Sequence, residues 1–325
     1  MKKALAILVL FFSICANLTG QTTHEDYTKD NGSLRVGTDK ADFLPYTSKG
    51  YTLVLPDAVK AVNGVIISLE DDKFNLAGDP KQQVHQQANA AGFAVLYLST
   101  GIPMDFYFFE SSLAYVDATL LKTFEKFNLP NRNIFFLGVS LSGHRALKYI
   151  EYIKTGRSRF IPQVKGVVLC DSVLDWVRQW YEEKKAVKDN VAPSSVFSGK
   201  LITYLFEKHL GGTPKNNLEA YLKFSPYCYF DEQRRNLKYF TDVNIRAYTE
   251  PATYYWMNER GKGVFDTNFP DMVGIINELK LMGNSTNELI VFNQDKNIND
   301  RRNPYYTWSL VDKAELLAWM ERQAR

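Results

Sequence analysis

Cysteine is scarce in this chain of 325 residues, which contains only three. Cys15 lies in the N-terminal apolar segment, so Cys170 and Cys228 alone remain in the rest of the chain. A disulfide between them is possible in an oxidising compartment. Because an unpaired cysteine commonly behaves as a small core residue, two buried free thiols are the favoured prediction.

Long apolar runs are also missing, apart from one at the N-terminus. Lys2 and Lys3 precede an apolar run of about 13 residues, which is too short to cross a bilayer. Small and polar residues follow, a layout typical of a secretory signal peptide. We therefore predict a signal peptide over residues 1–20, a bacterial origin, a secreted or periplasmic location, and no membrane span.

Charge of one sign does not predominate. The net charge is +3, and losing the two lysines of the signal would leave about +1. No basic run with interleaved aromatic residues occurs, so the sequence gives no support for binding nucleic acid or an anionic membrane. With 45% hydrophobic and 23% charged residues, the composition is that of an ordinary globular protein.

Short apolar runs alternate with longer helical patterns from residue 48 onward, after a polar segment over 21–47 that predicts a mobile lead-in or an edge strand. This alternation predicts an α/β domain over 48–325, with a mostly parallel central sheet flanked by helices. Sites in such domains lie at the carboxyl ends of strands. The expected strands are 51–55, 64–69, 92–98, 134–137, 166–170, 243–248 and 288–292, and the expected helices are 79–91, 111–127, 141–153, 271–282 and 312–322.

The segment between Cys170 and Val243 is too long for a loop in a compact domain. It contains helical patterns over 173–183, 195–210 and 217–224. We predict a helical cap inserted over about 173–235 between two strands.

A serine turn, Gly138-Val-Ser-Leu-Ser-Gly143, stands between an expected strand and an expected helix. A nucleophile on such a tightly bent turn needs small neighbours, as in the pattern Gly-x-Ser-x-Gly. Ser142 replaces the last glycine here, and Gly143 follows it. The plainer interpretation is that Ser140 is a turn residue selected for its size.

Residues 50–325 resemble the α/β-hydrolase superfamily in their strand–helix order, the serine turn, the cap insertion, two further strands and a closing helix. The resemblance implies that Ser140 is the acyl nucleophile and that the backbone N–H of Leu141 forms half of an oxyanion hole. It places an acid after the strand ending near Tyr248, where Glu250 is the candidate. Asp171, at the end of the strand before the cap, is the alternative acid.

The resemblance fails at the base, which should be a histidine after the strand ending near Phe292. The four histidines are His24, His85, His144 and His209, so none follows residue 209. Tyr305 and Tyr306 occupy the expected place, and a tyrosine with a pKa of about 10 is a poor general base. We interpret His144 as structural and leave the base unknown, with His209 from the cap or Lys296 in a Ser–Lys pair as alternatives.

The loop after the strand at 64–69 also departs from the family pattern, which often has His-Gly or Gly-Gly there. Three acids, Glu70, Asp71 and Asp72, follow this strand instead. They lack metal-ligand spacing, so a solvated charged turn is predicted. The sequence predicts no metal and no cofactor.

The sequence therefore predicts a secreted α/β-hydrolase-fold protein related to serine ester or acyl hydrolases, with an incomplete triad and impaired or absent catalysis. Its partner would be a small-molecule ligand or an ester substrate. The alternative is a non-catalytic protein that binds a ligand or partner in the former active-site pocket, under an aromatic cap containing Trp176, Trp180 and Tyr181. A protein-interaction module is a third class, for which the sequence offers no feature.

Overall fold

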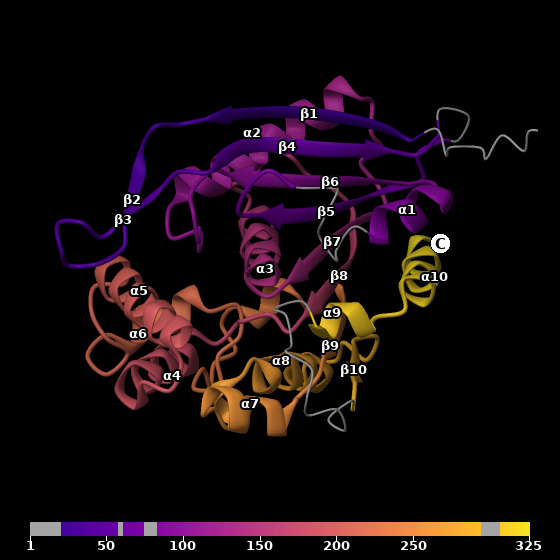
Figure 1. The fold of residues 1–325 in the computed structure, drawn as a ribbon. Helices are drawn as coiled ribbons and strands as arrows, with labels where there is room; N and C mark the ends of the chain where they lie inside the picture. Colours follow the sequence, from indigo (N-terminus) through magenta and orange to yellow (C-terminus); the bar gives the residue numbers. More distant parts are fainter. Residues whose placement is uncertain (1–20, 58–60, 75–82, 294–305) are drawn as a thin grey trace, which may run out of the picture.

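The computed structural model describes residues 21–57, 61–74, 83–293 and 306–325. Its centre is an eight-stranded sheet, in which five neighbouring pairs from β6 to β10 are parallel and the pairs β1–β4 and β4–β6 are antiparallel (Figure 1). The predicted α/β architecture is confirmed. In spatial order the strands are β1 (Thr22–Lys29), β4 (Ser48–Leu55), β6 (Phe93–Thr100), β5 (Gly64–Glu70), β7 (Ile134–Val139), β8 (Val164–Cys170), β9 (Asn244–Thr249) and β10 (Glu288–Val291).

The central strands are buried on both faces because helices cover both sides of the sheet. Every residue of β6 and β7 is buried, which explains why these strands read as nearly continuous apolar runs. One face packs against α2 (Glu110–Lys126), α3 (Leu141–Lys154) and α8 (Phe269–Leu281). The other packs against α1 (Gln83–Ala90) and α10 (Lys313–Ala324). The predicted start of α1 at Asp79 lies outside the described residues.

The segment before β4 is structured and not a mobile lead-in. β1 forms the edge of the large sheet, as the alternative prediction stated. The hairpin of β2 (Ser33–Arg35) and β3 (Phe43–Pro45) brings Leu34, Val36 and Leu44 against the apolar core of the cap. The N-terminal segment therefore connects the sheet edge to the cap.

The cap lies between β8 and β9, as predicted, and consists of α4 (Trp176–Asp189), α5 (Pro193–His209) and α6 (Leu218–Phe224) (Figure 1). Trp176 stacks on Phe206 with ring centroids 4.3 Å apart, and both are fully buried. Trp180 is also buried, whereas Tyr181 is half exposed. The interpretation of these tryptophans as the roof of a pocket is wrong, because they form the cap's own core.

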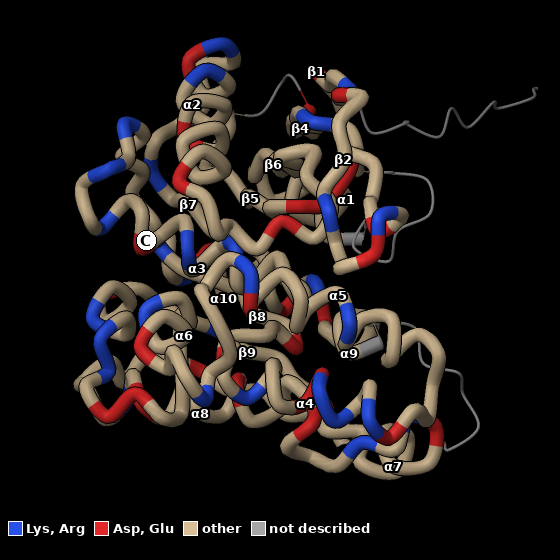
Figure 2. Tube along the Cα trace, turned by 90° about the vertical axis from the view of Figure 1, so that its left-hand side faces the viewer, with Lys and Arg blue, Asp and Glu red and all other residues tan. Residues whose placement is uncertain are grey.

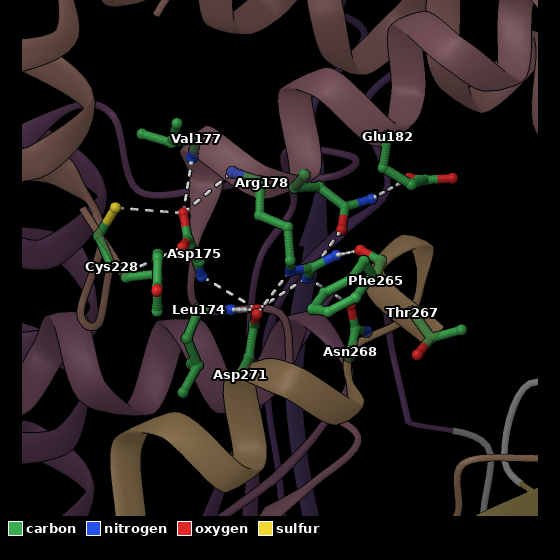
Figure 3. A network of polar contacts seen from close by, with 12 residues as sticks. Leu174, Asp175, Val177, Arg178, Glu182, Cys228, Phe265, Thr267, Asn268 and Asp271 are labelled. Carbon is green, nitrogen blue, oxygen red and sulfur yellow. Dashed lines mark hydrogen bonds and ion pairs between the residues drawn. The ribbon is translucent and has the colours of Figure 1, made fainter. Parts of the chain in front are cut away.

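A buried polar network fastens the start of the cap to the main domain (Figure 3). Asp271 of α8 accepts hydrogen bonds from the backbone N–H groups of Leu174 and Asp175 at 2.8 and 3.0 Å. It also pairs with the Arg178 guanidinium through Nε at 2.6 Å and Nη2 at 2.8 Å. Four donors thus converge on one carboxylate, which holds the first turn of α4 against α8.

Sequence analysis did not predict two short helices, α7 (Thr253–Arg260) and α9 (Tyr306–Leu310). Cys170 and Cys228 are both buried and form no disulfide with each other, as favoured. Among the described residues, no helix is long and apolar enough to cross a membrane. Basic and acidic residues are scattered over most of the chain (Figure 2).

Candidate active site

Ser140 occupies a sharp turn between β7 and α3. Its backbone has φ 56° and ψ −122°, a region that residues with a side chain rarely adopt. Such a conformation costs of order 1–3 kcal/mol and persists only where the surroundings enforce it. The Ser140 N–H donates to the carbonyl of Cys170 at 2.9 Å, so the turn is held at the carboxyl end of the neighbouring strand β8.

The residues on either side of Ser140 must be small because neighbouring parts of the chain approach them closely. A Cβ on Gly138 would lie 2.2 Å from the Cα of Gly143, and a Cβ on Gly143 would lie 2.0 Å from Ser172 Oγ. Ser142 has room, and its Oγ donates to the Val139 carbonyl at 2.8 Å and accepts from the Val139 N–H at 2.9 Å. This explains why the chain tolerates serine at 142 but has glycine at 143.

The Ser140 side chain is exposed, and its hydroxyl has no hydrogen-bond partner among the described residues. Leu141 is the first residue of α3, so its N–H has no intrahelical acceptor. A backbone donor therefore stands beside the serine hydroxyl, as an oxyanion site requires.

Asp171, one of the two candidate acids, is connected by the fold to the segment after β10. Its carboxylate accepts from Thr249 Oγ1 at the end of β9 at 2.6 Å, and from Thr307 Oγ1 in α9. The Asn268 amide donates to the Asp171 carbonyl at 2.9 Å. Glu250 is buried just past β9. The two threonines were missed by sequence analysis, although Thr249 directly follows the strand predicted over 243–248.

His144 is structural, as interpreted from the sequence. The ring is fully buried. Its Nε2 lies 2.9 Å from the Phe106 carbonyl, and its Nδ1 accepts from the Trp176 indole N–H at 3.0 Å. These partners require a neutral ring with the proton on Nε2. Burial, with a contribution from the nearby charge of Lys148, lowers its pKa well below the usual range. Neither nitrogen can take a proton from Ser140.

The other histidines are also occupied elsewhere. His209 lies in α5 between Phe108 and Phe109, with ring centroids 5.0 and 4.9 Å away, and burial lowers its pKa. His85 is buried on α1, and His24 packs on Phe127 from β1. Lys296 and Tyr305 lie outside the described residues, as does the side chain of Tyr306.

The acidic loop after β5 is not simply solvated, which corrects the prediction. Glu70 accepts from Ser68 Oγ at 2.5 Å, and Asp72 accepts from the backbone N–H of Ser48 at 2.8 Å. Asp71 pairs with the guanidinium of Arg145. These contacts neutralise or orient the carboxylates that would otherwise repel a nearby anion.

Arg145 is a fully buried residue of α3 that sequence analysis missed. Its guanidinium donates to the Leu69 carbonyl at 3.3 Å and to the Asp105 carbonyl at 2.6 Å, besides pairing with Asp71. One side chain thus ties the loops after β5 and β6 to the helix that follows the serine turn. A cation five residues after Ser140, in the helix that follows the serine turn, was the only signal in the sequence.

No group of three histidine, cysteine or acidic side chains within the described ranges could hold a metal ion. Within the described part of the chain, the site comprises a strained serine turn, a backbone N–H without an intrahelical acceptor and a carboxylate bound by two threonines.

No protein-family model matches the sequence, and no curated protein matches it. Solved structures are similar at low identity. Acylaminoacyl peptidase from Pyrococcus horikoshii has a TM-score of 0.54 at 12% identity, over 95% of this chain and 42% of its own. Carboxyl esterase 2 from Tuber melanosporum has a TM-score of 0.53 at 15% identity, over 95% and 90%. A thermostable esterase from Pseudomonas putida has a TM-score of 0.51 at 11% identity, over 94% and 82%.

This chain spans less than half the length of the peptidase but nearly all of the esterase from Tuber melanosporum. The similarity to the esterases extends over the sheet and the cap, since it covers nearly the whole of this chain. Together with the strand order and the serine turn after β7, these findings show that the chain has the α/β-hydrolase fold.

Proposed function

We propose that this protein is an exported relative of serine ester or acyl hydrolases that retains the nucleophile turn but has lost the base, so that it hydrolyses ordinary esters poorly or not at all. Under this proposal, Ser140 corresponds to the nucleophile of such a hydrolase, and the Leu141 N–H corresponds to its oxyanion donor. The observation that carries the proposal is that no histidine follows residue 209, while His144 has both ring nitrogens engaged.

The contacts of Asp171 support the loss of the base. In a working triad the acid accepts a hydrogen bond from the imidazole N–H and holds the ring toward the serine. Here the Asp171 carboxylate accepts from two threonine hydroxyls, and one of them, Thr307, comes from the segment after β10. A threonine hydroxyl cannot serve as a general base near neutral pH.

The expected rate of ester hydrolysis follows from the catalytic groups that remain without a base. Removing a member of such a triad leaves only about 10³–10⁴-fold acceleration over water, supplied by the oxyanion donor and substrate binding. A serine hydroxyl without a base is a weak nucleophile, so acylation would be the step that fails.

Labelling with a fluorophosphonate probe tests the proposal directly, because the probe reacts only with an activated serine. We expect the purified wild-type protein to label no more strongly than Ser140→Ala. Labelling of the wild type that disappears in Ser140→Ala would show that an unrecognised group activates Ser140, and the proposal would be wrong.

A Ser140→Cys variant separates an unactivated serine from an inaccessible one. A thiol needs less activation than a hydroxyl, since part of it is ionised near neutral pH. Cys170 and Cys228 are buried, with 0% and 6% of their surface exposed, so the wild type gives a low background. We expect iodoacetamide to modify Ser140→Cys and to leave the folded wild type unmodified. If Ser140→Cys also stays unmodified, the turn is closed, and the missing base does not explain the lack of activity.

Export follows from the N-terminal segment and is part of the same proposal. Expression of the full chain in a bacterial host, followed by mass determination of the periplasmic product, tests it. The mature protein is expected to lack about 20 residues, in keeping with a cleaved signal peptide.

Binding of a ligand without turnover is the second candidate. The strained conformation of Ser140 favours it, because such strain tends to persist at sites that retain a function. Ligand binding becomes the leading function if Ser140→Cys is modified and the wild type is not labelled by the fluorophosphonate.

A further inference from the structure

The first cap helix, α4, buries two of its acidic side chains and exposes its lysines. Glu182 and Glu183 are buried, with 4% and 3% of their surface exposed. Lys184, Lys185 and Lys188 on the same helix are exposed, as is one acid, Asp189, at its C-terminal end beside Lys185. The buried acids contribute little to the surface potential, so α4 presents a basic face even though its formal charges nearly balance.

The second cap helix, α5, carries a matching outer face. Phe197, Lys200, Tyr204 and Lys208 recur at intervals of three or four residues, which places them on one side of the helix. Phe197 is 59% exposed, and the Lys208 ammonium lies 5.5 Å from the Tyr204 ring centre. The opposite side of α5 is buried in the cap core.

The two faces form one surface. The Lys184 ammonium of α4 lies 3.8 Å from the Glu207 carboxylate of α5, and the Trp180 indole N–H donates to the same carboxylate at 3.1 Å. These contacts set the exposed side of α4 beside that of α5, and both helices lie at the periphery of the molecule (Figure 1). We call this the cap outer face; its residues are Tyr181, Lys184, Lys188, Phe197, Lys200, Tyr204 and Lys208.

The cap outer face is strongly basic. It holds four lysines and, at its seam, the single acid Glu207. Lys188, Lys200 and Lys208 form no ion pair with any residue that the structure describes. Basic residues are visible along α4 and α5 in Figure 2. The neighbouring Lys185 is different, because it pairs with Asp266.

We propose that the cap outer face docks on an anionic phospholipid surface. The lysines match the charge of the headgroups, while the half-exposed rings of Phe197 and Tyr181 can enter the headgroup boundary beside them. A soluble polyanion would satisfy the lysines alone and leave the phenylalanine ring in water. The net charge gave no support for binding an anionic membrane, but it cannot detect the burial of Glu182 and Glu183. The proposal does not depend on Ser140 or its activity.

Flotation of the purified protein with vesicles tests this docking. We expect binding to vesicles of equal phosphatidylcholine and phosphatidylglycerol, and none to phosphatidylcholine alone. Each lysine near an anionic surface contributes about fivefold in affinity. Lys200→Glu with Lys208→Glu should therefore weaken binding by at least about 25-fold. Raising the salt from about 50 to about 300 mM should weaken it strongly as well.

The matched control reverses two exposed lysines away from the cap, Lys122→Glu on α2 and Lys280→Glu on α8, which gives the same change in net charge. It should bind the anionic vesicles more than fivefold better than the cap variant. Equal losses in both variants would mean that net charge alone attracts the protein, and the proposal would be overturned.

Phe197→Ala distinguishes a lipid surface from a soluble polyanion. We expect it to weaken vesicle binding severalfold without changing retention on a heparin column. No flotation of the wild type with anionic vesicles at low salt overturns the proposal, and so does wild-type binding that Phe197→Ala leaves unchanged.

Discussion

From a buried pair of carboxyl groups in the cap, we predict that the stability of the protein depends on pH. Glu183 of α4 accepts hydrogen bonds from the Gln179 amide at 2.8 Å and from Ser198 Oγ at 3.3 Å. The adjacent Glu182 is also buried and pairs with the Lys262 ammonium at 2.5 Å. Glu182 thus has an ion pair, whereas the hydrogen bonds to Glu183 come from neutral donors. Burial, followed by the negative charge of Glu182, raises the pKa of Glu183 to about 7, while Lys262 opposes the shift.

The sign of the effect follows from the folded and unfolded states. The pKa of Glu183 is higher in the folded protein than the ordinary value of 4.5, so folding favours the protonated form. Its contribution to the free energy of unfolding is therefore fully present below about pH 4.5 and is lost as the pH rises through about 7. The difference corresponds to about 3 kcal/mol.

Glu183→Gln isolates this contribution, because glutamine keeps the shape of the protonated acid and can accept the same hydrogen bonds. Urea unfolding followed by circular dichroism would compare the variant and the wild type between about pH 5 and pH 8. We expect similar stability at the acid end and a variant more stable by about 3 kcal/mol at the alkaline end. The exposed Glu232→Gln serves as the control and should show no such trend. A variant that is no more stable than the wild type at pH 8 would refute the reasoning.

Three further substitutions test the site and its supports. Asp271→Ala leaves the buried Arg178 guanidinium without its counterion and should lower the free energy of unfolding by about 3–5 kcal/mol; a loss below 1 kcal/mol in urea unfolding would contradict the role of this pair. Gly143→Ala should lower the free energy of unfolding by about 1–3 kcal/mol in the same assay, because its Cβ would meet Ser172 Oγ at 2.0 Å. Gly156→Ala is the control: its Cβ would have open space, so only the strain of its own backbone changes. His144→Ala should also destabilise the protein by about 1–3 kcal/mol, because it removes the acceptor of a buried indole N–H. Fluorophosphonate labelling should stay unchanged in this variant, and a change in labelling would give His144 a chemical role.

Much of the fold could be predicted because its signals are local. The fully buried strands read as apolar runs, and the cap was indicated by a gap too long for a loop. The short helices α7 and α9, of eight and five residues, were missed because so few residues give only a weak periodic pattern, although the seven-residue α6 was predicted. The edge strand β1 has a polar sequence, and only its pairing with β4 identifies it.

The candidate site could be predicted only in part. The sequence identified Ser140 and the absence of a following histidine, because both depend on position along the chain. It could not show that Asp171 is bound by Thr249 and Thr307, which are 78 and 136 residues away from it. Nor could it show that Arg145 holds the acidic loop. These contacts join residues after different strands to one another or to helices, and their distances exist only after the sheet has formed.

The sequence by itself determined the α/β class, the serine turn and the absence of a histidine after residue 209, since apolar spacing, small turn residues and residue order are properties of the chain. The tertiary structure alone decided which charges are buried and which are exposed. It buried Glu182 and Glu183 of α4 and left the lysines of this helix on the surface, and it placed both ring nitrogens of His144 against fixed partners. The physical reason is that solvation and pairing depend on what surrounds a group in space, and these surroundings come from residues far apart in the chain.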